Sequence, residues 1–170
     1  MKCAGRVSLP SDRVREALFN LLSSLISWNE LTVLDLYAGS GALGLEALSR
    51  GAKKAIFVES SCKQISTLKQ NIELFSLEQT TFELIQDRAT HWISRFADPE
   101  IPCITFLDPP FSGNEYDLIL EKLAFLPAIR RGSIIVVESP NERKIVFPEN
   151  MELLKHRRYG TVTLDILRKC

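Results

Sequence analysis

The sequence predicts a single doubly wound α/β domain with a mainly parallel sheet of seven strands. Three observations support this fold class. Apolar, β-prone runs alternate with segments of helical periodicity, a glycine turn joins the first such run to a helix, and an acidic residue follows each of the first four strands. At 170 residues the chain is long enough for one sizeable core, so we expect one domain over residues 1–170.

The composition is that of an ordinary globular protein. Hydrophobic residues make up 45% and charged residues 25%, and 21 basic residues balance 21 acidic ones. No apolar run reaches the ~20 residues that span a membrane, and residues 1–10 lack the apolar core of a signal peptide. The four cysteines and two histidines have neither disulfide-framework nor metal-ligand spacing. We therefore expect a cytoplasmic monomer with free thiols, no metal and no membrane partner.

The first expected element is an amphipathic helix over residues 11–26. Apolar residues recur there at helical spacing, Pro10 precedes the segment, and Ser11 suits an N-cap with Asp12 in the first turn. Arg13 and Arg15 lie off the apolar stripe near its beginning. The apolar run 31–37 then predicts a strand, and the helix formers from Ala42 onward predict a helix.

The strand and helix pattern then repeats. Further strands are expected at 55–58, 82–85, 101–107 and 133–137, and further helices at 62–75, 91–96 and 115–125. The strands contain almost no polar residues, which indicates a sheet covered on both faces. Residues 151–159 and 161–168 meet at Gly160 with no room for a helix, so residues 151–170 are expected to form an antiparallel hairpin at the edge of the sheet.

The turn between the strand 31–37 and its helix has the features of a nucleotide-binding cradle. Gly39, Gly41 and Gly44 spell G-x-G-x-x-G, and glycines let the backbone turn tightly while a ligand lies against bare peptide at the helix N-terminus. Glu59 follows at the ~20-residue offset of a ribose-binding acid. NAD or FAD competes here with S-adenosylmethionine. Asp35 favours the latter, because an acid repels a pyrophosphate and attracts a sulfonium and an ammonium.

The acids that follow the first four strands are expected to face one crevice. They are Asp35, Glu59, Asp87 and Asp108. Ligands of doubly wound sheets bind outside the carboxyl ends of the strands, where these side chains would meet. For Asp87, a helix-capping role is an equally good interpretation.

The tetrapeptide Asp108-Pro109-Pro110-Phe111 is the predicted catalytic stretch. Two prolines cannot continue a sheet ladder, so they break away from the strand and hold a rigid, extended loop. The Asp108 carboxylate and the Pro109 carbonyl could orient the N–H groups of an exocyclic amine on a nucleobase toward a methyl donor. With an ordinary pKa of ~4, Asp108 would orient the amine and take the proton only after transfer. Phe111 would stack on the base. A purely structural Pro-Pro turn is the alternative.

These motifs resemble a known family. D-L-Y-A-G-S-G-A-L-G-L-E-A-L resembles motif I of class I methyltransferases, and D-P-P-F resembles their amino-group motif IV. With S-D-R-V-R-E-A-L-F-N-L-L, V-E-S and R-R-Y-G-T-V-T-L, the resemblance extends over nearly the whole chain to the bacterial 16S ribosomal RNA guanine-N2 methyltransferases. It implies a Rossmann-like class I methyltransferase fold, S-adenosylmethionine as cofactor, and a guanine of small-subunit rRNA as substrate, in the subunit or its assembly intermediate.

The resemblance also implies roles for individual residues. The backbone of Ala38, Gly39, Ser40 and Gly41 would hold the methionine end of the cofactor. Glu59 would bind the ribose hydroxyls. Asp87 with Arg88 would hold the adenine, and Asp108 to Phe111 the guanine.

The chain departs from the family pattern at its start. Family members usually begin with a basic hairpin and an R-P-T-S-D-R entry, whereas residues 8–13 read S-L-P-S-D-R. Either the start is late or RNA contact is reduced. The basic residues that could grip phosphate are Arg6, Arg13, Arg15, Lys155, His156, Arg157 and Arg158. A solvated hairpin face explains the second group nearly as well.

Three other functions compete with this one. An amino-methyltransferase acting on adenine in DNA or RNA, or on protein glutamine, would use the same D-P-P-F chemistry. A nicotinamide-dependent oxidoreductase would need a second domain and a catalytic residue that the sequence does not offer. A non-catalytic RNA-binding module is disfavoured because both the cofactor turn and D-P-P-F are intact.

Overall fold

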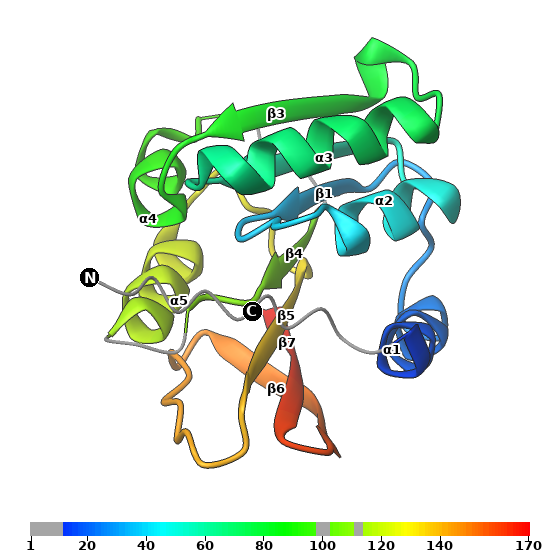
Figure 1. Cartoon of the computed structure of the whole chain (residues 1–170). Coiled ribbons are helices and arrows are strands. Elements are labelled where there is room, and N and C mark those ends of the chain that lie inside the picture. Colours follow the sequence, from blue (N-terminus) through cyan, green and yellow to red (C-terminus); the bar gives the residue numbers. More distant parts are fainter. Residues whose placement is uncertain (1–11, 98–102, 111–113) are drawn as a thin grey trace, which may run out of the picture.

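The computed structural model describes residues 12–97, 103–110 and 114–170. They form a seven-stranded sheet in the order β3-β2-β1-β4-β5-β7-β6 (Figure 1). The strands are β1 Thr32–Asp35, β2 Lys54–Glu59, β3 Phe82–Gln86, β4 Cys103–Leu107, β5 Ile134–Pro140, β6 Met151–Tyr159 and β7 Val162–Lys169. The first five strands pair in parallel, and β7 runs antiparallel to both of its neighbours. The predicted fold class is confirmed.

The hairpin of β6 and β7 forms one side of the sheet, and β7 has a paired strand on each side. β7 pairs with β5 from Ile134↔Arg168 to Pro140↔Val162, so β6 is the edge strand on this side of the sheet. A register shift between Leu153 and Lys155 interrupts the pairing of β6 with β7.

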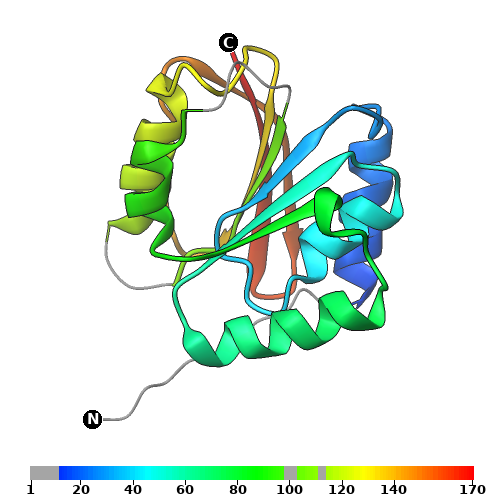
Figure 2. The same cartoon turned by 90° about the horizontal axis from the view of Figure 1, so that it is seen from above.

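Helices cover both faces of the sheet, as the apolar strands predict (Figure 2). On one face lie α1 Asp12–Ser23, α2 Ala42–Ser49 and α3 Cys62–Leu74, and on the other lie α4 Ala89–Trp92, the 3-10 helix η2 Ile93–Arg95 and α5 Glu115–Phe125. A further short 3-10 helix, η1 Gln79–Thr81, precedes β3. Each face has its own apolar core: Phe19, Leu68 and Phe106 belong to the first, and Ile93, Leu120 and Val137 to the second.

The first helix is shorter than the predicted 11–26. It ends at Ser23, because the next amide N–H groups bond three residues back, from Ser24 to the Leu21 carbonyl and from Leu25 to the Leu22 carbonyl. The hydroxyl of Ser24 also bonds to the Leu21 carbonyl at 2.6 Å, which satisfies an acceptor that a longer helix would use.

Within the described residues, no helix combines the length and hydropathy required to cross a membrane.

Candidate active site

The four predicted acids lie at one edge of the sheet. The strands that they follow are neighbours, in the order β3-β2-β1-β4, and all four run in the same direction. From β1 the chain moves outward to β2 and β3, and it then returns to the other side of β1 to form β4. The carboxyl ends of β1 and β4 therefore flank the topological switch point, which is where doubly wound sheets bind ligands.

The glycine turn closes on itself at this edge. The Gly41 N–H donates to the Ala38 carbonyl at 2.7 Å, and both Gly39 and Gly41 have the positive φ that favours glycine, at 54° and 82°. A Cβ on Gly39 would meet only the Tyr37 carbonyl oxygen, 4.0 Å away, among the described residues. The turn therefore presents bare peptide to open space at Gly39.

The other two glycines of the motif serve packing. A Cβ on Gly41 would lie 2.2 Å from Leu68 of α3, and one on Gly44 would lie 2.3 Å from the ring of Phe57 on β2. Neither approach is possible for a real Cβ. Gly41 and Gly44 thus let α2 and its turn sit close to the sheet and α3, while Gly39 leaves space for a ligand.

Asp35 lies beneath the turn. Its side chain is only 3% exposed and accepts a hydrogen bond from the Gly44 N–H at 3.0 Å. It therefore satisfies one of the free amides in the first turn of α2. Burial raises the pKa of Asp35 to about 7, and the charges of Asp108 and Glu59 add to this, while the Gly44 bond opposes it. A cationic ligand above the turn would favour the ionised form of Asp35. That Asp35 attracts a sulfonium or an ammonium stays a prediction.

Glu59 reaches back to the glycine turn. One carboxylate oxygen accepts from the Gly39 N–H at 2.9 Å and the other from the Ser61 N–H at 2.8 Å. Each oxygen keeps a lone pair for a further donor. The structure therefore brings together two residues that the sequence analysis assigned to one cofactor, as its ribose-binding acid and its glycine cradle.

A residue that the sequence analysis did not single out supports the turn from α3. The side-chain amide of Asn71 donates to the Ser40 carbonyl at 2.8 Å. Its neighbour Ile72 is buried in the core, so the amide lies at the boundary between the packed face of α3 and the turn. A polar residue beside the apolar stripe was the only sign of this contact.

Asp87 and Arg88 follow β3 at the same edge. The Asp87 carboxylate bonds to His91 Nδ1 at 3.0 Å, to the Arg88 N–H at 2.8 Å and to the guanidinium of Arg95. The hydrogen bond from His91 is the largest cause of a lowered pKa at Asp87. Arg88 lies largely exposed, 3.6 Å from Glu115 of α5. Their predicted contact with an adenine stays a prediction.

Asp108 directly follows β4, and burial raises its pKa to about 7. This is higher than the ordinary value assumed from the sequence, because the partly buried Asp108 side chain is withdrawn from water. Pro109 is buried and Pro110 is exposed, while Phe111 lies outside the described residues. The Pro109 carbonyl accepts a hydrogen bond from the hydroxyl of Tyr116 at 3.3 Å.

A further buried acid, Glu138, lies near Asp108. It ends the apolar part of β5 and is 3% exposed. Burial and then the charge of Asp108 raise its pKa to about 8. From sequence its only mark was the V-E-S match to the family.

The basic residues of the hairpin divide between the two faces of β6. Cross-strand partners share a face: Lys155 pairs with Ile166 and Arg157 with Leu164, and both partners belong to the core beneath α1. His156 and Arg158 are paired instead with Asp165 and Thr163 on the opposite face. His156 Nδ1 lies 2.6 Å from the Asp165 carboxylate.

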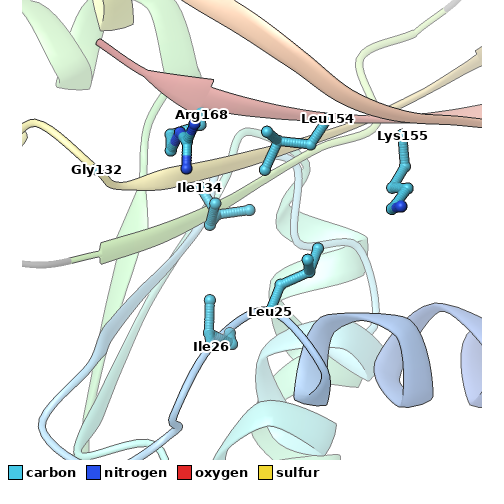
Figure 3. A pocket seen from close by; sticks show the side chains of 7 residues that line it. All are labelled: Leu25, Ile26, Gly132, Ile134, Leu154, Lys155 and Arg168. Carbon is cyan, nitrogen blue, oxygen red and sulfur yellow. The ribbon is translucent and has the colours of Figure 1, made fainter.

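Lys155 lies on the wall of a groove of about 410 Å³ between the end of α1 and the hairpin (Figure 3). The groove has an apolar floor of Leu25, Ile26, Ile134 and Leu154. Gly132 and Ile134, at the start of β5, place it at the opposite edge of the sheet from Asp108.

The remaining predicted RNA contacts lie on or before α1. Arg13 is exposed, and Arg15 forms an ion pair with Asp12 at 3.0 Å. Arg6 lies outside the described residues. A group of three or more metal-ligating side chains is absent from the described part of the chain.

Residues 10–168 match the sequence model of a protein family described as Conserved hypothetical protein 95. The chain is 34% identical, over 152 residues, to the ribosomal RNA small subunit methyltransferase D of Haemophilus influenzae, a match that covers 89% of this chain and 78% of that protein.

Solved structures agree with the fold described above. A putative methyltransferase, yhhF, from Escherichia coli superposes with a TM-score of 0.83 at 29% identity and covers 95% of this chain and 88% of that one. SMU.776, a putative methyltransferase complexed with SAH, has a TM-score of 0.73 and covers 92% of this chain and 48% of that one. At 15% identity the second likeness shows the fold alone.

Proposed function

Because the chain belongs to the Conserved hypothetical protein 95 family, we propose that it transfers a methyl group from S-adenosylmethionine to the exocyclic N2 amine of a guanine in small-subunit (16S) rRNA. A relative that is named as a methyltransferase of the small-subunit rRNA supports this RNA as the substrate. One observation carries the proposal: the glycine turn and the D-P-P segment leave adjacent strands at the same edge, with Asp35 paired to Phe106 two residues before Asp108.

The residues of the turn suit the methionine and ribose parts of the cofactor. Gly39 offers bare peptide beside open space, and Glu59 lies against it with lone pairs available for two ribose hydroxyls. Among the described residues, the carboxylates of Asp35 and Glu59 lie at the glycine turn, which suits a ligand with a sulfonium and an ammonium. When bound, S-adenosylmethionine would supply an electrophilic methyl group on sulfur and would leave as S-adenosylhomocysteine with the electron pair of the broken sulfur–methyl bond. Asp87 and Arg88 complete the proposed cofactor site on the adenine side.

Asp108 and Pro109 orient the acceptor amine. Its two N–H groups donate to the Asp108 carboxylate and the Pro109 carbonyl, which turns the nitrogen lone pair toward the methyl group. Both acceptors stand on a rigid loop, because neither Pro109 nor Pro110 can rotate about φ. Phe111 stacks on the unstacked base in this proposal.

The Asp108 carboxylate also accepts the proton that the amine loses. As the nitrogen–methyl bond forms, positive charge develops on the nitrogen, and ionised Asp108 stabilises it. The nitrogen then gives a proton to Asp108. A pKa of about 7 makes this aspartate a stronger base than an ordinary carboxylate, while leaving much of it ionised at neutral pH.

RNA contact falls to basic residues near the start of the chain and on the hairpin. Arg6, Arg13 and Arg15 near the start of the chain and Arg157 and Arg158 on the hairpin are the proposed phosphate contacts, and Lys155 adds one at the groove. The shape of the RNA and its neighbours in the particle select the target in this proposal.

The test is transfer of tritiated methyl from S-adenosylmethionine to small ribosomal subunits, or their assembly intermediates, from cells that lack the corresponding enzyme. The RNA is then digested to nucleosides and separated. We expect label in N2-methylguanosine with the wild-type protein and none with Asp108→Ala, which should still bind S-adenosylhomocysteine. Label in N6-methyladenosine would refute the choice of base, and label in protein glutamine the choice of RNA. Absence of transfer, despite cofactor binding, would refute the substrate.

A further inference from the structure

The pairing of β4 with β5 ends beside the proposed catalytic residues. The last pair is Leu107↔Val137. Beyond it, Pro109 and Pro110 carry no N–H and cannot donate to the next carbonyl of β5. The main-chain carbonyls of Pro109 and Glu138 therefore need a donor from elsewhere, since buried acceptors without a partner are costly.

The hydroxyl of Tyr116 meets both of these carbonyls. It lies 3.1 Å from the Glu138 carbonyl oxygen and 3.3 Å from the Pro109 carbonyl oxygen. A phenol has one proton, so the two acceptors share one donor. This hydroxyl joins the ends of β4 and β5 at the point where the ladder can no longer do so.

The ring that carries the hydroxyl is held firmly. Tyr116 is completely buried on the second residue of α5, and the guanidinium of Arg143 lies over its ring, 4.4 Å from the centroid. The preceding residue, Glu115, accepts a hydrogen bond from the hydroxyl of Tyr37 at 2.9 Å. The start of α5 is thus attached to the segment that leads into the glycine turn.

We propose that Tyr116 is a positioning residue for methyl transfer, whose hydroxyl fixes the direction of the Pro109 carbonyl that orients the acceptor amine. This inference rests on the proposed function. A carbonyl oxygen has two lone pairs, so one can accept from Tyr116 while the other accepts from the amine. Amine orientation contributes to the rate only if this acceptor is held in place when the methyl group is transferred.

A merely structural hydroxyl would have a different signature. If Tyr116 only satisfied two buried carbonyls, its loss would lower the free energy of unfolding and leave turnover by the folded protein unchanged. A positioning role instead predicts a lower kcat with unchanged KM for RNA and unchanged affinity for the cofactor product.

The variant for the test is Tyr116→Phe, which keeps the ring and its contact with Arg143. Its control is Tyr159→Phe, which removes a hydroxyl from a partly buried tyrosine on β6. We expect kcat of Tyr116→Phe to fall about tenfold, equivalent to ~1.4 kcal/mol. KM for the RNA particle and Kd for S-adenosylhomocysteine should stay within twofold of wild type. Tyr159→Phe should change none of these values.

A second measurement reports the hydrogen bond without any substrate. Pro109-Pro110 is the one Pro-Pro pair among the 8 prolines of the sequence. Labelling proline with carbonyl ¹³C and ¹⁵N therefore gives a single directly bonded carbonyl–nitrogen pair, and its coupling selects the Pro109 carbonyl in an NMR spectrum. We expect Tyr116→Phe to shift this resonance, and Tyr159→Phe to leave it in place.

The outcomes separate the two proposals. A shifted Pro109 resonance together with a lower kcat supports the positioning role. An unshifted resonance overturns it whether or not the wild type transfers label, and so does a kcat within twofold of an active wild type. Failure of the wild type to methylate any guanine overturns the proposed function instead.

Discussion

Alanine substitutions at two glycines of the G-x-G-x-x-G motif should have different main effects, one on stability and the other on cofactor affinity. In Gly44→Ala the new methyl would lie 2.3, 2.8 and 3.0 Å from three ring atoms of Phe57, which is itself completely buried. Overpacking of this kind costs ~1–3 kcal/mol, and the better helix propensity of alanine offsets up to ~1 kcal/mol. We expect the free energy of unfolding to fall by about 1–2 kcal/mol, or about 2–8 °C in Tm for a chain of this size.

Gly39→Ala meets no such obstacle. Apart from its own chain neighbours, the nearest described atom to the new methyl is 4.0 Å away, so the cost to folding is the strain of a φ of 54°, about 1–2 kcal/mol. The methyl would instead occupy the space that we assign to the cofactor. We expect the Kd for S-adenosylhomocysteine to rise at least ~10-fold, whereas in Gly44→Ala it should stay within about threefold.

The assays are urea unfolding followed by circular dichroism and titration calorimetry with S-adenosylhomocysteine. The double variant Gly44→Ala, Phe57→Leu is the control for the first effect, because a smaller side chain at position 57 should make the added methyl less costly than it is against Phe57. Wild-type affinity in Gly39→Ala would refute the assignment of the open side of the turn to the cofactor. Wild-type stability in Gly44→Ala would refute the packing argument.

Three further outcomes follow from the site. The rate of methyl transfer should rise with pH and level off above about 7, since Asp108 acts in its ionised form and burial raises its pKa to about 7; a rate that is flat from pH 5.5 to 8.5 would contradict this. Between its ordinary pKa and about 7, Asp35 binds more protons in the folded protein than in the unfolded chain, so the free energy of unfolding should fall as pH rises through that window. Asp35→Asn should make this dependence on pH less steep, as measured by urea unfolding at pH 5, 6 and 8. An unchanged dependence would exclude Asp35 as its source. Asn71→Ala should lower the free energy of unfolding by about 1 kcal/mol and weaken S-adenosylhomocysteine binding several-fold, because the Ser40 carbonyl loses its donor; wild-type binding in calorimetry would show that the turn keeps its shape without it.

The sequence was most informative where one local rule decides the structure. Parallel strands that alternate with helices must end at a common edge, so the positions of Asp35, Glu59, Asp87 and Asp108 followed from counting elements. Helical periodicity also predicted a helix at 115–125, which is α5. It could not show that the hydroxyl of Tyr116 bonds to two carbonyls, because those contacts depend on how α5 lies on the sheet.

Charge states were the least predictable feature of the site. The ordinary pKa assumed for Asp108 was too low, since burial is a property of the assembled site and not of the D-P-P-F letters.

Side-chain placement also depended on the assembled fold. The hairpin sequence places Lys155, Arg157 and Arg158 together, whereas β pairing turns their side chains to different faces. The amide of Asn71 contacts a turn 31 residues earlier, a distance at which helical spacing carries no information.

The position of β7 has a consequence for how the chain assembles during synthesis. It lies between β5 and β6, although every other strand precedes it along the chain. Until β7 is made, the emerging sheet has an unpaired edge at β5, and β6 has no partner to join. A nascent chain must therefore keep an apolar strand edge from pairing with other chains until residues 162–169 arrive, which makes this interval the time of greatest risk of aggregation.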